Sequence, residues 1–451
     1  MRVLLVQAFT ALDMELVYPI GLAYLAAHLD GHEVSIFDLN LHRDAPFPAL
    51  EEELQRFKPE VVGISLRNMK VGMPHLYTDD FQPQQDTIVF IKKTCPGVKV
   101  IAGGTAFSLY AEAMMRRVPA IDIGVWGEAE HRLPQLLKVL DEPWHVPGVY
   151  YRGDGDQIRF TGSPPGVDFA ALRPPRRDLV PAAPYAASSF VSVGVQTKRG
   201  CSLTCIHCSD VYLAGARVRM RPVAEVVDEM EHLVYDHGVK QLFLCDQIFN
   251  IPVKHAADLC KEIVNRKLEV AWSAWFNENR KTLPDELLVW LRRAGCGLLS
   301  FSPDHVDDRM LKALGKNFKR EDLLYTVEAA RKHGMDVEYS FFLNSPGEDL
   351  RSLWEIFKFL GHARWQLGPR LRPFTLLLMQ PIRIYPHTKL AEKAREMGII
   401  PADHDLIEGQ YWNPGELKYV VKGIQRGASA AYGARQAWRK MRGVTGASLA
   451  R

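Results

Sequence analysis

Three cysteines lie within eight positions of the chain, at Cys201, Cys205 and Cys208. Thiolates are soft ligands, and three of them on one loop can face a single metal centre. Their uneven spacing, three residues and then two, suits a loop around an iron–sulfur cluster better than a tetrahedral zinc site, which prefers pairs separated by two residues. With only three protein ligands, a four-iron cluster would keep one iron open to another molecule, which implies chemistry.

A second reading of these cysteines is that they are free or zinc-bound and unreactive. His207 stands between two of them and is expected to point to solvent. The other four cysteines are spread along the chain without the spacing of metal ligands, so we expect buried thiols and no second cluster. They are Cys95, Cys245, Cys260 and Cys296.

The elements that must position the cysteines follow a repeating pattern. Residues 1–141 alternate short β-branched apolar runs with amphipathic stretches, which predicts βαβ units around a parallel sheet. Gly103-Gly104 and Gly127-Glu128 each follow a predicted strand directly. Ligands of open α/β sheets bind at these carboxyl ends of strands, so both pairs are candidate binding positions. The alternative is that these glycines only form tight turns between strand and helix.

The rest of the chain divides where its amino-acid composition changes. Residues 142–188 are rich in Pro, Gly and Arg and are predicted to be a linker with a small hairpin over 149–160. Residues 189–400 return to the strand and helix alternation, with about six repeats, which predicts a partial (β/α)6 barrel similar to a TIM barrel. The cysteines follow its first strand. Residues 401–451 form a basic extension without an assigned role.

The composition limits the class of protein. The chain has 451 residues, of which 47% are hydrophobic and 24% charged, as expected for two to four globular domains. Its net charge of +3 gives no field that would favour nucleic acid, so a small-molecule partner is expected. No apolar run approaches the roughly 20 residues that span a bilayer, and no secretion signal is evident, so a cytoplasmic location is expected.

Cys201-x3-Cys205-x2-Cys208 at the end of a first barrel strand resembles the signature of radical S-adenosylmethionine (SAM) enzymes, and the amino-terminal domain resembles the cobalamin-binding domain of one large subgroup. The resemblance extends from residue 1 to about residue 400. Its further segments are Tyr18–Ala26, Val62–Asn68, Ile101–Gly104, Gly127–Glu130, Leu242–Asn250, Arg309–Lys316, Ser345–Glu348 and Tyr385–Thr388. It implies an α/β protein with a Rossmann-like cobalamin domain and a radical SAM barrel.

The resemblance implies that the three cysteines ligate a [4Fe-4S] cluster whose fourth iron is chelated by SAM. Asp246, after the second barrel strand, is then the candidate partner of the methionine ammonium, since a carboxylate accepts a charge-assisted hydrogen bond there. Arg280, expected at the end of the third strand, could clamp a carboxylate. Ser302 and Asp304 match the place where relatives contact the ribose. A helix cap for Asp246 and a surface position for Arg280 are the alternatives.

For cobalamin, the resemblance implies contacts at three strand ends. The expected residues are Ser65, Arg67, Asn68, Gly103, Gly104, Thr105, Gly127 and Glu128. The Asp-x-His-x-x-Gly motif is absent, so no histidine ligand to cobalt is expected from it. Arg67 beneath the corrin would disfavour a lower cobalt ligand, because a guanidinium has no lone pair to offer. Equally, Arg67 could bind a backbone carbonyl or a propionamide as part of the framework.

The implied activity is methyl transfer from SAM, through cobalamin, to a poorly activated carbon of a small molecule, with an external one-electron reductant such as flavodoxin or ferredoxin. Relatives that cyclise or rearrange carbon skeletons, and relatives that methylate an aromatic carbon without a radical, are the alternatives. A cobalamin or iron–sulfur sensor would be a non-enzymatic use of the same domains. No residue identifies the substrate, and no catalytic residue is assigned.

Overall fold

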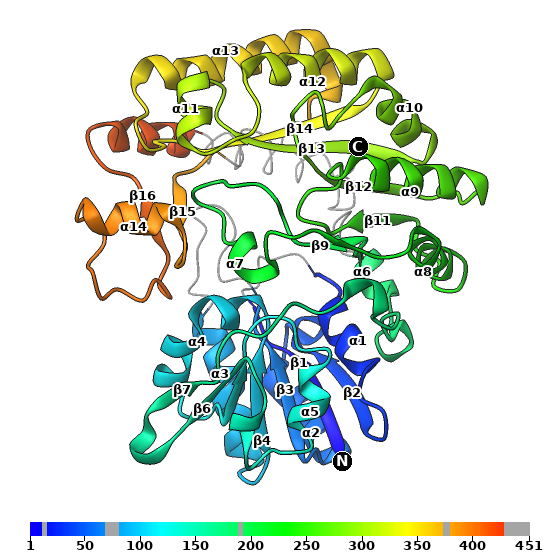
Figure 1. The fold of residues 1–451 in the computed structure, drawn as a ribbon, viewed down its shortest axis with the longest axis vertical. Coiled ribbons are helices and arrows are strands. Elements are labelled where there is room, and N and C mark those ends of the chain that lie inside the picture. Colours follow the sequence, from blue (N-terminus) through cyan, green and yellow to red (C-terminus); the bar gives the residue numbers. More distant parts are fainter. Residues whose placement is uncertain (11–15, 68–80, 188–192, 373–378, 428–451) are drawn as a thin grey trace.

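The computed structural model describes residues 1–10, 16–67, 81–187, 193–372 and 379–427. Two sheets form the centres of two domains (Figure 1). The amino-terminal sheet has the order β2-β1-β3-β4-β5-β6-β7, and its first five strands are parallel. The second sheet has the order β14-β13-β12-β11-β8 and is parallel throughout. The predicted α/β class with two parallel sheets is confirmed.

Helices cover both faces of the amino-terminal sheet, because apolar side chains alternate between the two faces along its strands. Leu4 and Val6 pack toward α2, α3 and α4, whereas Val3 and Leu5 pack toward α1 and α5. The strands are β1 (Arg2–Gln7), β2 (Glu33–Asp38), β3 (Val61–Ser65), β4 (Lys99–Gly103) and β5 (Ile123–Val125). The helices are α1 (Ile20–Ala26), α2 (Pro46–Phe57), α3 (Phe81–Thr94), α4 (Thr105–Arg117) and α5 (Arg132–Leu136), with the 3-10 helix η1 (Leu39–His42).

The hairpin expected in the linker extends this sheet. Strand β6 (Val149–Arg152) pairs antiparallel with β5 and with β7 (Ile158–Phe160), so the amino-terminal domain continues through residue 160. Four short 3-10 helices and α6 (Ala183–Ala186) account for the other linker elements. The 3-10 helices are η2 (Pro143–His145), η3 (Asp154–Asp156), η4 (Phe169–Ala171) and η5 (Arg177–Leu179).

The barrel sheet packs one face against a layer of amphipathic helices, with Leu259, Leu288 and Phe359 among the buried contacts. Its strands are β8 (Gly194–Val195), β11 (Gln241–Leu244), β12 (Ala271–Phe276), β13 (Cys296–Asp304) and β14 (Asp336–Phe341). Its helices are α8 (Val223–Tyr235), α9 (Val253–Asn265), α10 (Asp285–Arg293), α11 (Asp308–Ala313), α12 (Arg320–His333) and α13 (Leu350–Leu367), followed by η6 (Gly368–Arg370). Near the cysteines lie β9 (Lys198–Arg199), α7 (Asp210–Ala214) and β10 (Arg219–Met220).

The predicted sixth barrel strand, residues 372–379, falls mostly outside the described residues. Its flanks are placed, because Leu371 bridges Val337 and Gln380 bridges Phe342, both in parallel. These bridges extend the parallel sheet beyond β14, as a sixth strand requires.

The carboxyl-terminal residues contact both domains. They contribute β15 (Ile382–Ile384), α14 (Lys389–Glu396) and β16 (Gln410–Trp412). Ile384 and Trp412 are buried in the same apolar cluster as Phe107 of α4 and Leu314, which follows α11. The side chain of Arg383 also donates a 3.3 Å hydrogen bond to the Tyr110 hydroxyl. The bounds of the predicted extension, 401–451, therefore cut through this unit.

No described helix is both long enough and apolar enough to cross a bilayer.

Candidate active site

The cysteine loop runs from Cys201 to Cys208, between β9 and α7, and three neighbouring segments hold its backbone. The amide of Cys201 donates to the carbonyl of Gly215 at 3.1 Å, and the amide of Ile206 donates to the carbonyl of Leu314 at 3.1 Å. The carbonyl of Ile206 accepts from the amide of Leu390 at 2.9 Å. Gly215, Leu314 and Leu390 come from three separate parts of the chain, and together they hold the backbone of the cysteine loop.

Gly315 allows part of this support to come close. Its φ is +75°, which favours glycine, and a Cβ built there would stand 2.6 Å from the carbonyl oxygen of Thr204. The segment Arg309–Lys316 is one of the segments that resemble the family. Because Gly315 has no side chain, this segment can place its backbone directly against the cysteine loop.

The three thiols line one cavity of about 220 Å³ at the carboxyl ends of the barrel strands. The cavity is lined by Cys201, Leu203, Cys205, His207, Cys208, Asp210, Val211, Gln247, Ile248, Trp275, Phe276, Asn277, Glu278, Ser302, Asp304, Lys316, Phe318 and Phe342. Predicted residues Ser302 and Asp304 are brought here with the cysteines. Residues at the carboxyl ends of β12 and β13, and residues that follow β11, β12 and β13, supply the opposite walls.

The donor set fits a cluster. Burial raises the pKa of Cys201, raises that of Cys205 to about 11 and raises that of Cys208. Buried thiolates need a positive partner, and a cluster of iron ions supplies one. Among the described residues no group of three His, Cys, Asp or Glu side chains is spaced to hold a metal ion. The fit therefore rests on three thiols around one hollow.

A buried ionic group lies beside the thiols. The Lys316 ammonium is 2.5 Å from a carboxylate oxygen of Asp304 and donates to the carbonyl of Ser302 at 2.9 Å. His207 places its Nε2 3.3 Å from the same Asp304 oxygen. The expectation that His207 points to solvent is wrong: its ring packs against Phe342, and burial lowers its pKa to about 4.

Glu278 is a site residue that the sequence did not reveal. It lies two residues beyond β12, its side chain is buried, and its Oε1 has no hydrogen-bond partner among the described residues. Burial raises its pKa to about 8. Gln247, three residues beyond β11, likewise has a buried Oε1 without a described partner. In the sequence, Glu278 and Gln247 could have been found only as polar residues that closely follow a strand, and many residues in such positions have no function.

Asp246 and Arg280 are not brought to the cavity. Asp246 accepts from the amides of Thr197 and Lys198 at 2.8 and 3.1 Å, from the Thr197 hydroxyl at 2.6 Å and from the Lys198 ammonium at 3.0 Å. Both of its oxygens therefore tie β11 to the segment before the cysteines. Arg280 is exposed over the ring of Tyr325, because β12 ends at Phe276, earlier than expected.

At the amino-terminal sheet, five of the predicted residues gather at the carboxyl ends of β3 and β4. They are Ser65, Arg67, Gly103, Gly104 and Thr105, whereas Asn68 lies outside the described residues. Gly104 has a φ of +94°, and a Cβ there would lie 2.6 Å from the carbonyl of Leu66. The turn between β4 and α4 therefore itself requires glycine at position 104. Burial lowers the pKa of the Arg67 guanidinium, and Asp38 opposes this effect.

Glu128 connects the domains instead of facing a free edge. Its carboxylate accepts from Arg219 at 2.6 Å, from the amide of Val167 at 2.9 Å and from Arg199 at 3.3 Å. Arg199 also lies 2.6 Å from Glu130. Gly127, with a φ of +71°, donates its amide to Ser108 at 2.8 Å. A cofactor contact from these two residues stays a prediction.

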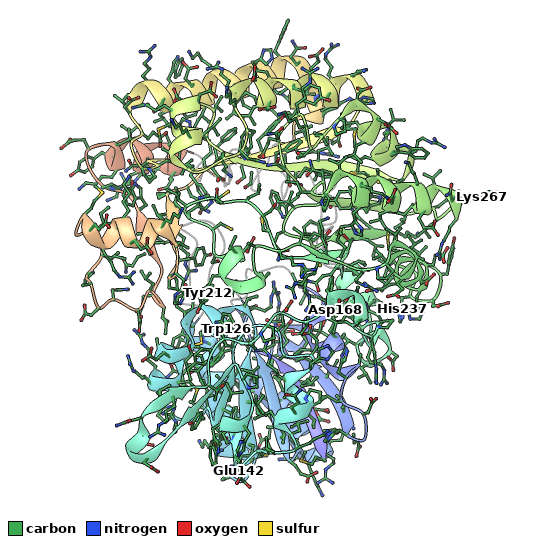
Figure 2. All side chains as sticks on the ribbon, viewed as in Figure 1. Trp126, Glu142, Asp168, Tyr212, His237 and Lys267 are labelled. Atoms are coloured by element: carbon green, nitrogen blue, oxygen red, sulfur yellow. The ribbon has the colours of Figure 1, made fainter. Side chains whose placement is uncertain are left out.

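The carboxyl ends of the two sheets face the same region. Asp38, at the end of β2, accepts a 2.6 Å hydrogen bond from Tyr185 of α6, which leads into the barrel. Trp126, directly after β5, donates to the hydroxyl of Tyr212 in α7 at 3.1 Å. Figure 2 shows Trp126 and Tyr212 at the junction between the domains. A ligand at the end of either sheet therefore lies toward the other.

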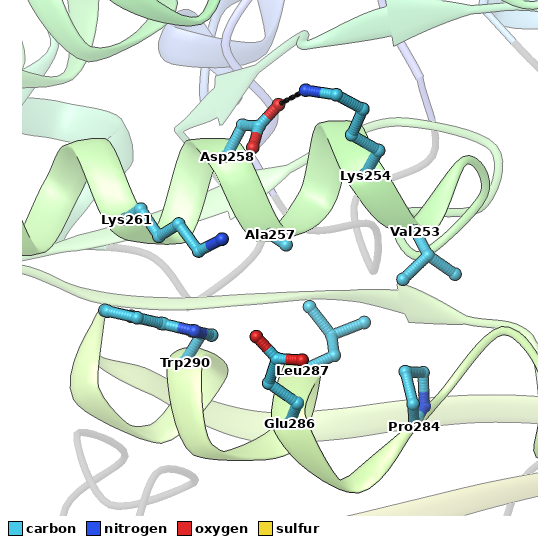
Figure 3. Close-up of a pocket in the computed structure, with 9 residues that line it drawn as sticks. All are labelled: Val253, Lys254, Ala257, Asp258, Lys261, Pro284, Glu286, Leu287 and Trp290. Atoms are coloured by element: carbon cyan, nitrogen blue, oxygen red, sulfur yellow. Dashed lines mark hydrogen bonds and ion pairs between the residues drawn. The ribbon is translucent and has the colours of Figure 1, made fainter.

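A larger hollow of about 380 Å³ lies outside the barrel between α9 and α10 (Figure 3). It is lined by Val253, Lys254, Ala257, Asp258, Lys261, Pro284, Glu286, Leu287 and Trp290, and Lys254 pairs with Asp258 at 2.5 Å. None of the predicted site residues lines it. The smaller cavity with the sulfurs is therefore the candidate active site.

The chain matches two family models, the B12 binding domain over residues 14–137 and the radical SAM superfamily over residues 195–360. It belongs to the radical SAM enzymes that carry a B12-binding domain. An uncharacterized methyltransferase of Pyrococcus horikoshii is 28% identical over 76% of this chain and 72% of the relative. The anaerobic magnesium-protoporphyrin IX monomethyl ester cyclase of Rubrivivax gelatinosus is 25% identical over 75% of this chain and 61% of the relative.

The fold of this radical SAM protein matches a solved structure. A radical SAM methyltransferase from Kitasatospora setae, solved with tryptophan substrate and a SAM analogue, superposes with a TM-score of 0.74 at 22% identity, covering 88% of this chain and 76% of the other. The likeness extends across both domains. It supports the predicted two-domain architecture.

Proposed function

We propose that this radical SAM protein is a methyltransferase that moves the methyl group of SAM, through cobalamin, to a poorly activated carbon of a small molecule. The observation that carries the proposal is the cavity in which three cysteine thiols meet an unpartnered carboxylate oxygen at the carboxyl ends of the barrel strands. Similarity to methyltransferases supports it. An external one-electron donor and a cytoplasmic location belong to the proposal.

Cys201, Cys205 and Cys208 would hold a [4Fe-4S] cluster, and cobalamin would lie at the ends of β3 and β4. Bound there, the cluster supplies an electron to cleave SAM, and cobalamin supplies a carrier for the methyl group. Glu278 offers a carboxyl group to a cationic group of SAM, whose positive charge would favour the ionised form, and Ser302 and Gln247 offer hydrogen bonds. Trp275 and Phe276 give an apolar wall that excludes water.

The test is anaerobic reconstitution with iron, sulfide and hydroxocobalamin, followed by reduction with titanium(III) citrate and incubation with SAM labelled in its methyl group. We expect S-adenosylhomocysteine and label in the cobalamin fraction. Cys201→Ala, Cys205→Ala and Cys208→Ala should lose iron, whereas the matched variant Cys95→Ala should keep it. Zinc in the loop, or neither chromophore in the wild type, would overturn the proposal.

The similarity to a cyclase favours one second candidate, a cyclisation or rearrangement of a carbon skeleton. The two candidates differ in their products. Methyl transfer with hydrogen abstraction forms S-adenosylhomocysteine and 5'-deoxyadenosine in about equal amounts, whereas a rearrangement forms no homocysteine product. Methylation of an aromatic carbon without a radical would form S-adenosylhomocysteine without 5'-deoxyadenosine.

A further inference from the structure

The outer side of the cysteine loop is exposed to solvent and is bordered by cationic side chains of neighbouring segments. Ser202 and Thr204 are exposed, although both neighbour a cysteine of the cavity. The loop is therefore thin at this point: one of its sides lines the cavity, and the other meets solvent. A molecule seated on Thr204 would be separated from the cavity by little more than one layer of backbone.

Three exposed cations lie on segments whose backbone contacts the cysteine loop or the residue before it. Lys312 lies in the last turn of α11, two residues before Leu314, whose carbonyl accepts from the amide of Ile206. Lys389 begins α14, next to Leu390, whose amide donates to the carbonyl of Ile206. Arg217 brings its carbonyl so close to Gly200 that no Cβ would fit between them. In Figure 1, α11 and α14 lie on the left side of the view, and α7 lies nearer its centre.

These cations are not neutralised by the protein. Among the described residues, none of the three makes an ion pair, although other surface lysines and arginines do. The first turn of α14 carries one opposing carboxylate, Glu392, which is exposed. Counted over residues 210–217, α11 and α14, six lysines and arginines stand against four aspartates and glutamates, so these segments keep a net charge of +2.

We propose that the surface around Thr204, with Arg217, Lys312 and Lys389, is the docking surface for a small acidic electron-transfer protein. This inference rests on the proposed function, because it requires a cluster behind the loop. One electron leaves the reduced centre of the donor and enters the oxidised cluster, and no bond or proton needs to move. Opposite charges speed such encounters and align the partners.

The test measures how fast reduced flavodoxin, an acidic donor, generates the electron paramagnetic resonance signal of the reduced cluster in the holoprotein. We expect the wild-type rate to fall steeply with added salt. At low salt, the rate for Lys312→Glu/Lys389→Glu should be about tenfold lower than the wild-type rate. Lys240→Glu is the matched control, because Lys240 is exposed and precedes β11 at the opposite ends of the strands. Reduced methyl viologen, a small cation, should not reduce the double variant more slowly.

An unchanged flavodoxin rate in the double variant, an equal fall in Lys240→Glu, or an equal fall with methyl viologen would overturn the docking surface. Iron and sulfide analysis separates this result from failure of the proposed function, in which the wild type itself holds no cluster. Should charge reversal lower the iron content, Lys312→Gln/Lys389→Gln repeats the comparison with smaller substitutions. An unchanged rate in that pair would likewise overturn the proposal.

Discussion

The indole Nε1 of Trp126 donates a 3.1 Å hydrogen bond to the hydroxyl of Tyr212, and so joins the end of the amino-terminal sheet to the helix after the cysteine loop. Tyr212 also stacks on His387, with ring centroids 4.0 Å apart. One side chain thus links three parts of the chain.

We expect Tyr212→Phe to lower the free energy of unfolding by about 1 kcal/mol, because it removes the hydrogen bond and keeps the stacking. A double-mutant cycle with Trp126→Phe, measured by denaturant unfolding, isolates the pair. Strictly additive effects of the two substitutions would contradict the contact.

Gly315→Ala should impair cluster assembly. The new Cβ meets the carbonyl of Thr204 at 2.6 Å, so the cysteine loop must shift. Gly398→Ala is the matched control, because Gly398 also has positive φ, +65°, but has no atom within 4 Å of the added carbon. Both variants should lose about 1–2 kcal/mol of stability from the backbone conformation. Only Gly315→Ala should reconstitute with less iron, and equal iron contents would refute the role of the close approach.

Glu278→Gln should weaken SAM binding by about tenfold in the reconstituted protein, since a hydrogen bond to a charged group contributes roughly 1.5–3 kcal/mol. Equilibrium dialysis with labelled SAM measures the change, and iron content serves as the control. Affinity within twofold of the wild type would remove Glu278 from the SAM site.

The strand alternation and the cysteine spacing were sufficient to predict both parallel sheets and the loop that faces the cavity. They were not sufficient for Asp246 and Arg280. The donors that occupy Asp246 come from Thr197 and Lys198, about fifty residues earlier in the chain, and such pairings arise only when β8 and β11 lie side by side. Arg280 was misplaced because β12 ends four residues before it, and the charged residue after β12 that lines the cavity is Glu278.

Glu229→Gln should destabilise the fold by about 3–5 kcal/mol. Glu229 is buried 2.5 Å from both Arg177 and Arg221. Burial acts to raise its pKa, but the two guanidinium groups lower it below the ordinary 4.5 overall. Its contribution is therefore complete above pH 4.5 and is lost as the pH falls through the lower folded value. Thermal unfolding at neutral pH measures the loss, and a midpoint equal to that of the wild type would contradict it.

His255 should make the free energy of unfolding depend on pH between the pKa of its side chain in the folded protein and that in the unfolded chain. Burial lowers its folded pKa from 6.5 to about 4. The unfolded chain therefore binds the proton first, and stability falls as the pH drops from about 6.5 toward 4. His255→Gln should flatten the thermal midpoint over this window while keeping an amide near the Thr197 hydroxyl. Parallel curves for the two proteins would exclude His255 as the source.

The carboxyl-terminal unit has a consequence for how a substrate could enter. Residues 380–412 contact α4 in the amino-terminal domain and Leu314 beside the cysteine loop, so they connect the two domains in addition to the linker and to the side-chain contacts of Glu128 and Trp126. A protein shortened before Gln380 would lose this connection, and the passage between the two sheet ends would be bounded by the remaining contacts alone.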